Sequence, residues 1–206
     1  MAETGNRRPE AAKPDGKPDT KLDTKLDTKL EPWLRGTHGE IPAIGRAVVH
    51  ALELAREDVE RWTAGMTDEQ LNRRPSGLPS VAWQMRHMAR SVDRLLSYAE
   101  GRQLSAEQME ALRGEAGSGQ DGAGQDGSGQ AGAGTAAGLH GELMAAFEDG
   151  MRRVTALAKV APETPRGVGR RALPTTVGGL LVHVADHTQR HAGQLVTTAK
   201  LVRAEG

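Results

Sequence analysis

The stretch HVADHTQRHAGQ, residues 183–194, contains two histidines one helical turn apart, His187 and His191, followed directly by Gly193 and Gln194. On an α-helix, residues four apart share one face with Cβ atoms roughly 5–6 Å apart, so two imidazoles can reach one cation at about 2.0–2.1 Å. His191 also falls within the apolar stripe of this segment. A buried imidazole needs partners for its nitrogens, so the pattern predicts either a metal ligand or a histidine hydrogen-bonded to a carbonyl or carboxylate.

A catalytic metal site usually takes three protein ligands and keeps one position open, so a third histidine has to come from elsewhere. The remaining candidates are His38, His50, His87, His140 and His183. His50 lies opposite the apolar stripe of its segment, which predicts exposure to solvent. His38 and His140 stand at helix starts beside flexible chain. His183 lies one turn before His187, and three stacked histidines on one helix do not converge easily on one ion.

His87 belongs to a different predicted helix, which favours it as a partner for the pair. On the helical wheel it nevertheless lies off the apolar stripe, near Gln84 and Ser91, so periodicity alone leaves it on the surface.

Composition excludes several classes of function. The 206 residues contain 27 basic and 27 acidic side chains, so no net charge attracts the chain to nucleic acid or anionic lipid. There is no cysteine, which excludes disulfides, thiolate zinc sites and a cysteine nucleophile. No apolar run reaches the roughly 18–20 residues of a membrane span, and the amino terminus lacks the apolar core of a signal peptide. We therefore expect a cytoplasmic protein without nucleic-acid or membrane partners.

Two low-complexity stretches frame the domain organisation. Residues 1–31 contain a fourfold-spaced TKLD repeat with leucine as its only bulky apolar residue, which predicts a disordered tail. Residues 114–138 are rich in glycine and predict a flexible inserted loop. The rest, residues 32–204, is expected to form one domain, because long loops between packed helices cost little closure entropy.

Four amphipathic segments predict an all-α fold, a four-helix bundle with its site built from interior side chains. The segments cover residues 38–64, 81–100, 139–160 and 176–204. Thr37 and Glu40 are placed as a capping box before the first helix, with Pro42 close to its start. Ser80 is the expected N-cap of the second.

Two segments together resemble the DinB-like (YfiT-like) metalloenzyme superfamily. They are LPSVAWQMRHMARSVDRLL, residues 78–96, and TVGGLLVHVADHTQRHAGQL, residues 176–195. Proteins of that family are four-helix bundles that hold a divalent metal with three histidines, one in the second helix and two, four residues apart and followed by Gly-Gln, in the last. The resemblance covers the chain from about residue 31 to residue 202 apart from the glycine-rich insertion, and it implies His87, His187 and His191 as the metal ligands.

The resemblance also implies an activity. Characterised relatives include thiol-dependent enzymes, such as mycothiol-dependent maleylpyruvate isomerase and bacillithiol S-transferases, and some metal-dependent hydrolases. A three-histidine zinc or nickel site with an open position lowers the pKa of water or of a thiol, and a chain without cysteine must take that thiol from a co-substrate. The expected function is a metal-dependent S-transferase acting on small molecules. The alternatives are a metal-dependent hydrolase and a non-catalytic, stress-linked bundle with a structural metal or none.

Other polar residues near the histidines are candidates for supporting roles. Gln194, three residues after His191, and Ser91, one turn after His87, are positioned to orient a ligand, although a residue closing a helix contact and a surface serine fit the same pattern. Gly193 favours close helix approach. Asp186 points to the far side of its helix and is expected in solvent. A homodimer is expected only by analogy with relatives.

Overall fold

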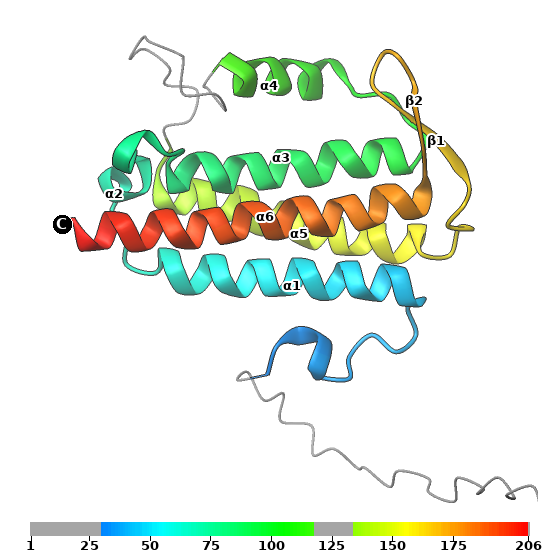
Figure 1. The fold of residues 1–206 in the computed structure, drawn as a ribbon, viewed down its shortest axis with the longest axis horizontal. Coiled ribbons are helices and arrows are strands. Elements are labelled where there is room, and N and C mark those ends of the chain that lie inside the picture. The colour runs from blue at the N-terminus through cyan, green and yellow to red at the C-terminus, as the bar shows by residue number, and fades with distance from the viewer. Residues whose placement is uncertain (1–29, 118–133, 206) are drawn as a thin grey trace, which may run out of the picture.

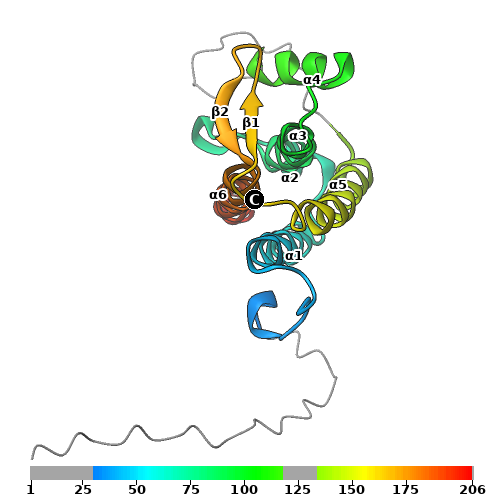
Figure 2. The same cartoon turned by 90° about the vertical axis from the view of Figure 1, so that its right-hand side faces the viewer.

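The computed structural model describes residues 30–117 and 134–205, and this part of the chain is predominantly helical, as predicted. Four long helices lie side by side (Figures 1 and 2). They are α1 (Ala43–Thr63), α3 (Val81–Ala99), α5 (Ala136–Leu157) and α6 (Val177–Ala204). Helix α3 packs against α5 and α6, and α1 packs against the same two helices from the other side. The buried apolar side chains of all four helices form one hydrophobic cluster between them.

Several smaller elements were not predicted from the sequence. They are the 3-10 turns η1 (Pro32–Leu34) and η2 (Pro75–Gly77), the helices α2 (Asp68–Asn72) and α4 (Ala106–Gly117), and an antiparallel hairpin of β1 (Pro165–Val168) and β2 (Leu173–Thr176). Figure 1 shows α4 running back along α3, while α3 and α5 point in the same direction. The most consequential of these elements is α4, because it covers a face of α3 that the apolar pattern assigned to solvent.

Local capping explains where the predicted helices begin. The hydroxyl of Ser80 accepts a hydrogen bond from the backbone N–H of Trp83 at 3.1 Å, so the predicted N-cap of α3 is confirmed. Helix α6 is capped in the same way by Thr176. The predicted capping box of Thr37 and Glu40 is wrong, because α1 begins after Pro42 and has no side-chain cap. Proline favours the first helical turn, where its missing N–H costs nothing.

The glycine-rich stretch is helical at both of its ends. Residues 114–117 belong to α4, and residues 136–138 form the first turn of α5, which is capped by Thr135. Residues 118–133 of the predicted flexible loop, and all but the last residues of the predicted 1–31 tail, lie outside the described residues.

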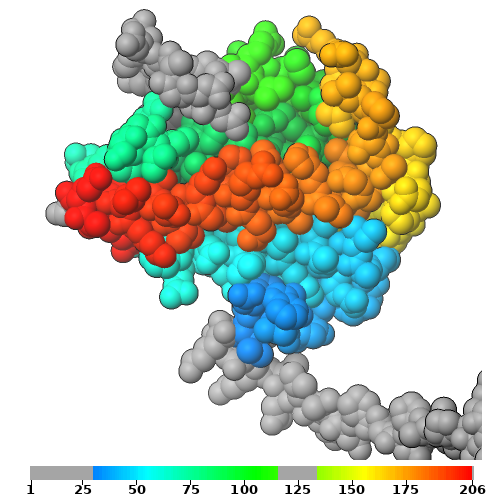
Figure 3. Space-filling view, in the orientation of Figure 1, coloured from blue at the N-terminus to red at the C-terminus, as the bar shows by residue number. Residues whose placement is uncertain are grey.

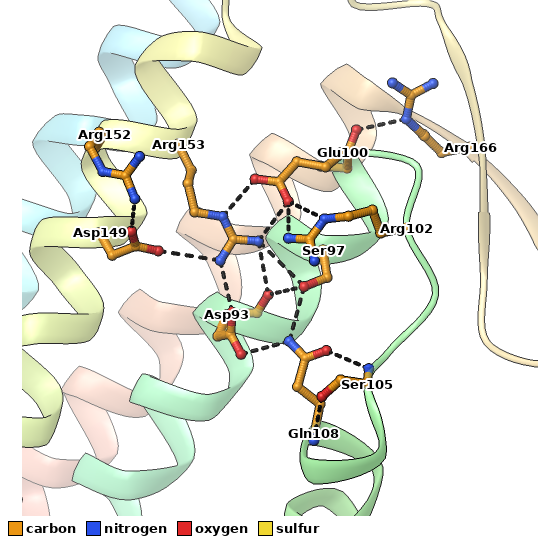
Figure 4. Close-up of polar contacts among 11 residues, drawn as sticks. Asp93, Ser97, Glu100, Arg102, Ser105, Gln108, Asp149, Arg152, Arg153 and Arg166 are labelled. Atoms are coloured by element: carbon orange, nitrogen blue, oxygen red, sulfur yellow. Dashed lines mark hydrogen bonds and ion pairs between the residues drawn. The ribbon is translucent and has the colours of Figure 1, made fainter.

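A network of polar contacts around the buried Arg153 joins α5, α3 and α4 at one end of the bundle (Figure 4). Arg153 of α5 donates to both carboxylate oxygens of Glu100, at 2.7 and 3.0 Å, and to Asp93 at 2.8 Å. Gln108 in the first turn of α4 donates to the other oxygen of Asp93 at 2.6 Å and to Ser97 at 3.0 Å. The start of α4 is therefore fixed to α3 by polar contacts, and the same residues of α3 also hold α5.

The β-hairpin is joined to the same region. Arg166 of β1 donates from Nε to the backbone carbonyl of Ala99, the last residue of α3, at 2.6 Å (Figure 4). This contact holds the segment that leads into α6 against the end of α3.

Within the described residues, no helix has both the length and the apolar character needed to cross a membrane.

Glycine at position 150 allows α5 to approach its neighbours closely. A Cβ atom at this position would lie 2.7 Å from Cγ1 of Val92 and 3.6 Å from Cδ1 of Leu52. We expect Gly150→Ala to lower the free energy of unfolding by about 1–3 kcal/mol, because the stiff, buried Val92 has to move. Urea unfolding followed by circular dichroism measures the change.

The matched control is Gly141→Ala on the same helix, where an added Cβ meets no atom within 4 Å. There the higher helix propensity of alanine should raise stability by up to about 1 kcal/mol. Equal stabilisation of both variants would contradict the close approach at Gly150.

Candidate metal centre

Three histidines meet between α3 and α6. His87 comes from α3, and His187 and His191 come from neighbouring turns of α6. Nε2 of His87 lies 3.0 Å from Nε2 of His187, and the ring centroid of His191 lies 4.4 Å from that of His87 and 4.5 Å from that of His187. One ligating atom from each residue lies within 4.8 Å of the other two. The structure thus brings together the three residues predicted as ligands, in a group that could hold a metal ion.

The outer nitrogens of two of these rings have polar partners. Nδ1 of His87 lies 3.0 Å from a carboxylate oxygen of Glu115 in α4, and Nδ1 of His191 lies 2.7 Å from the side-chain oxygen of Gln84 in α3. Since both partners are oxygen acceptors, each Nδ1 donates a proton to its partner, and in the neutral form of such a ring the lone pair lies on Nε2. Imidazoles that bind metals are usually oriented in this way. The donor set therefore fits a divalent cation.

Glu115 is itself held by α3. Arg94 donates to both of its carboxylate oxygens, at 3.1 and 2.9 Å. Burial by itself raises the pKa of Glu115, but hydrogen bonds from His87 and Arg94 outweigh that effect and keep the pKa below its ordinary value. Glu115 is consequently a carboxylate at neutral pH, and this is the form that accepts a hydrogen bond from His87.

Packing further restricts the rings. The indole of Trp83 stacks on His87 with a centroid distance of 4.6 Å and an angle of 8° between the planes. The same indole meets His191 edge-on at 6.0 Å. Ser91 bonds to the backbone carbonyl of His87 at 2.6 Å and lies 3.3 Å from its Nε2.

The two histidines that α6 contributes to the cluster, His187 and His191, are neutral at physiological pH. Burial first, and then repulsion from His87 and His187, lower the pKa of His191 from 6.5 to about 3, while a hydrogen bond with Gln194 acts in the opposite direction. Burial together with repulsion from His87 lowers the pKa of His187 to about 4. Neutral imidazole is the form that binds a metal, so a cation does not have to displace protons from these two rings at neutral pH.

The structure corrects three expectations about exposure. His87 and Ser91, which periodicity left on the surface, are buried, because α4 and the side chain of Glu115 cover that face of α3. His50, expected in solvent, is also buried, beneath the segment that precedes α1. Asp186 is exposed as expected, and it pairs with Arg190 at 3.0 Å.

Sequence reasoning missed three residues of the site: Glu115, Arg94 and Trp83. It also treated Gln84 only as a neighbour of His87 on the wheel. A signal existed for Gln84, which lies one turn before His87 on α3, and for Arg94, which lies two turns after His87 on the same face. No signal pointed to Glu115, which stands among glycines and alanines, 28 residues after His87.

A pocket of about 360 Å³ lies between the start of α3 and α6, and none of the three histidines is among the described residues of its wall. Gln84, which holds the ring of His191, is also part of its wall. The remaining wall residues are Leu78, Pro79, Arg190, Gly193, Gln194, Thr197 and Thr198. Gln194 is exposed and faces this pocket as well as His191.

Fold and site together define a predominantly helical protein with a cluster of histidines that could bind a metal. The chain belongs to the DinB superfamily, whose family model matches residues 51–195. That stretch contains all three histidines of the cluster and Glu115.

A solved structure, described as the conserved protein of a locus from Enterococcus faecalis, is similar in fold. It is 23% identical, with a TM-score of 0.56 over 78% of this chain and 97% of that chain. At this identity the similarity concerns the fold alone. No curated protein matches the chain.

The lowered pKa values predict a pH-dependent stability. Once unfolded, His187 and His191 take up protons near pH 6.5, but in the folded chain only near pH 4 and 3. Between these values the unfolded state binds more protons, so we expect the metal-free protein to lose stability as the pH falls from 6.5 towards 4. The loss is complete once both folded-state pKa values are passed. Urea unfolding at stepped pH values measures it.

His191→Gln should show a smaller loss over this pH range than the unaltered chain. His140→Gln, at a position on α5 outside the cluster, should keep the full loss. The interpretation fails if the His191 variant follows the same pH dependence as the unaltered chain.

Proposed function

We propose that this protein is a divalent-metal-dependent enzyme that activates a low-molecular-weight thiol for transfer to a small electrophile. The cluster of His87, His187 and His191 carries the proposal, because the three rings converge in a group that could hold a metal ion. Polar partners orient the rings of His87 and His191, and Gln84 connects the cluster to a pocket. In this proposal, α1, α3, α5 and α6 form a four-helix bundle of the DinB type, and the site lies between its second and last helices.

The three imidazoles would hold the cation through their Nε2 atoms, and three nitrogen ligands suit zinc or nickel. When bound, such a cation supplies a Lewis acid that lowers the pKa of a thiol or of water towards neutrality. Glu115 and Gln84 keep the rings of His87 and His191 in the required tautomers. Trp83 covers His87 and excludes water from that side.

The pocket supports a small-molecule substrate. Among the described residues of its wall, Arg190 is the only charged one, and its guanidinium together with the amides of Gln84 and Gln194 offers hydrogen-bond donors to an anionic group. No carboxylate or histidine that could act as a base is found among those described wall residues. The chain has no cysteine, so the reacting thiol would come from a co-substrate.

Zinc binding tests the metal centre. His187→Ala should remove the zinc equivalent bound at this cluster, and Glu115→Gln should weaken its affinity by about 10–100-fold, because the ring of His87 loses its carboxylate partner. Isothermal titration of the full chain measures both effects. Glu110→Gln, an exposed position on α4, is the control and should bind like the unaltered chain. Unchanged zinc binding in the His187 variant would overturn the proposed metal centre.

Thiol consumption tests the chemistry. Metal-loaded protein should consume bacillithiol, mycothiol or glutathione in the presence of an electrophile such as a chlorinated nitrobenzene, and His191→Ala should reduce the rate to background. Equal thiol loss with both proteins would contradict transferase activity. Turnover of an ester or amide panel without added thiol would instead favour the hydrolase.

A further inference from the structure

A second cluster of potential ligands lies away from the three-histidine cluster. It consists of His38, in the segment before α1, with His50 and Glu53 of α1. One ligating atom from each residue lies within 4.8 Å of the other two. Nε2 of His38 lies 2.9 Å from a carboxylate oxygen of Glu53, and the two imidazole centroids are 5.6 Å apart. His50 and Glu53 are three residues apart and therefore share one face of the helix.

This cluster is on the opposite side of α1 from the proposed active site. Figures 1 and 2 show the segment containing η1 on the side of α1 that faces away from α3 and α6, and Figure 3 shows that segment packed against the helix. The two clusters share no residue. An ion in one of them therefore does not depend on an ion in the other.

The segment that carries His38 is firmly attached. Arg35 forms a two-pronged ion pair with Glu57 of α1, at 2.5 and 2.8 Å. Glu57 is thereby occupied, while Glu53, one turn earlier, faces His38. The hydroxyl of Thr37 lies 3.2 Å from Nε2 of His50. The flexible surroundings expected for His38 are therefore not found, and its ring has a defined position.

The backbone at His38 supports a built site. Its φ angle is +60°, in the left-handed region that residues other than glycine seldom adopt. Such conformations cost energy and persist where the surrounding structure enforces them. Here the conformation places the imidazole against Glu53 and beside His50. Because His50 is buried and the side chains of His38 and Glu53 are 30% and 16% exposed, the cluster is covered on one side and open to solvent on the other.

We propose that His38, His50 and Glu53 form a second divalent-cation site, which holds the segment before α1 against that helix. Two imidazole nitrogens and one carboxylate oxygen are a known donor set for zinc. Imidazole ligands favour zinc and related transition metals over calcium and magnesium, which prefer oxygen. The proposal is independent of the function proposed above, because it concerns different residues on a different face.

Counting zinc equivalents in variants of the full chain tests the proposal. Equilibrium dialysis against zinc followed by elemental analysis should give two equivalents for the unaltered protein. His38→Asn should leave one, since asparagine tolerates the left-handed backbone but cannot replace the imidazole at this distance. Glu53→Gln keeps the size of the side chain and removes its charge, and it should weaken the second equivalent at least about tenfold.

The chain supplies its own controls. Of its seven histidines, His140 and His183 belong to neither cluster, and their replacement by alanine should leave both equivalents. His187→Ala should remove only the equivalent of the other site. Circular dichroism of every variant shows whether it is folded.

Two results would overturn the second site. One is that the unaltered protein takes up only the equivalent that His187→Ala removes. The other is that both equivalents survive in folded His38→Asn and Glu53→Gln, which would leave His38 and Glu53 as an ion pair only. If the unaltered protein instead binds one equivalent that His38→Asn removes and His187→Ala does not, the proposed function is contradicted and the second site stands.

Discussion

The position of His87 in the histidine cluster depends on one buried carboxylate. Glu115 lies between Arg94 and His87, and it joins α4 to the face of α3 that contributes to the site. A buried charge is costly unless it is paired and fully hydrogen-bonded, and Glu115 meets that condition through two residues of α3. At the other end of α4, Gln108 contacts Asp93 and Ser97 in a comparable way. Polar contacts at both ends therefore fix the position of α4.

The way each helix is attached to the rest of the protein explains which parts of the fold could be predicted from the sequence. The ends of α3 and the start of α6 follow from local signals, an apolar stripe and the capping hydroxyls of Ser80 and Thr176. The i, i+4 spacing of His187 and His191 is equally local. Helix α4 escaped prediction because periodicity identifies helices by an apolar stripe, and α4 is attached largely through charged and amide side chains.

The same reasoning accounts for the errors in predicted burial. His87 and His50 both lie off the apolar stripes of their helices, and the wheel therefore placed both in solvent. Each is covered by a segment from elsewhere in the chain, α4 over His87 and the residues before α1 over His50. The resemblance to the DinB family supplied His87 where periodicity did not. Nothing comparable supplied Glu115, whose role depends on contacts between distant parts of the chain.

Gln84 connects the histidine cluster with the pocket, and this connection bears on how the proposed thiol chemistry would work in a chain without cysteine. Its side-chain oxygen fixes His191, while the same residue forms part of the pocket wall. A ligand in the pocket would therefore lie next to the residue that orients the ring of His191. Because the chain has no thiol of its own, none can compete for the cation or form a mixed disulfide with a co-substrate. A borrowed thiol would then be the only sulfur nucleophile at the site, and selectivity would rest on which thiol and electrophile the pocket admits.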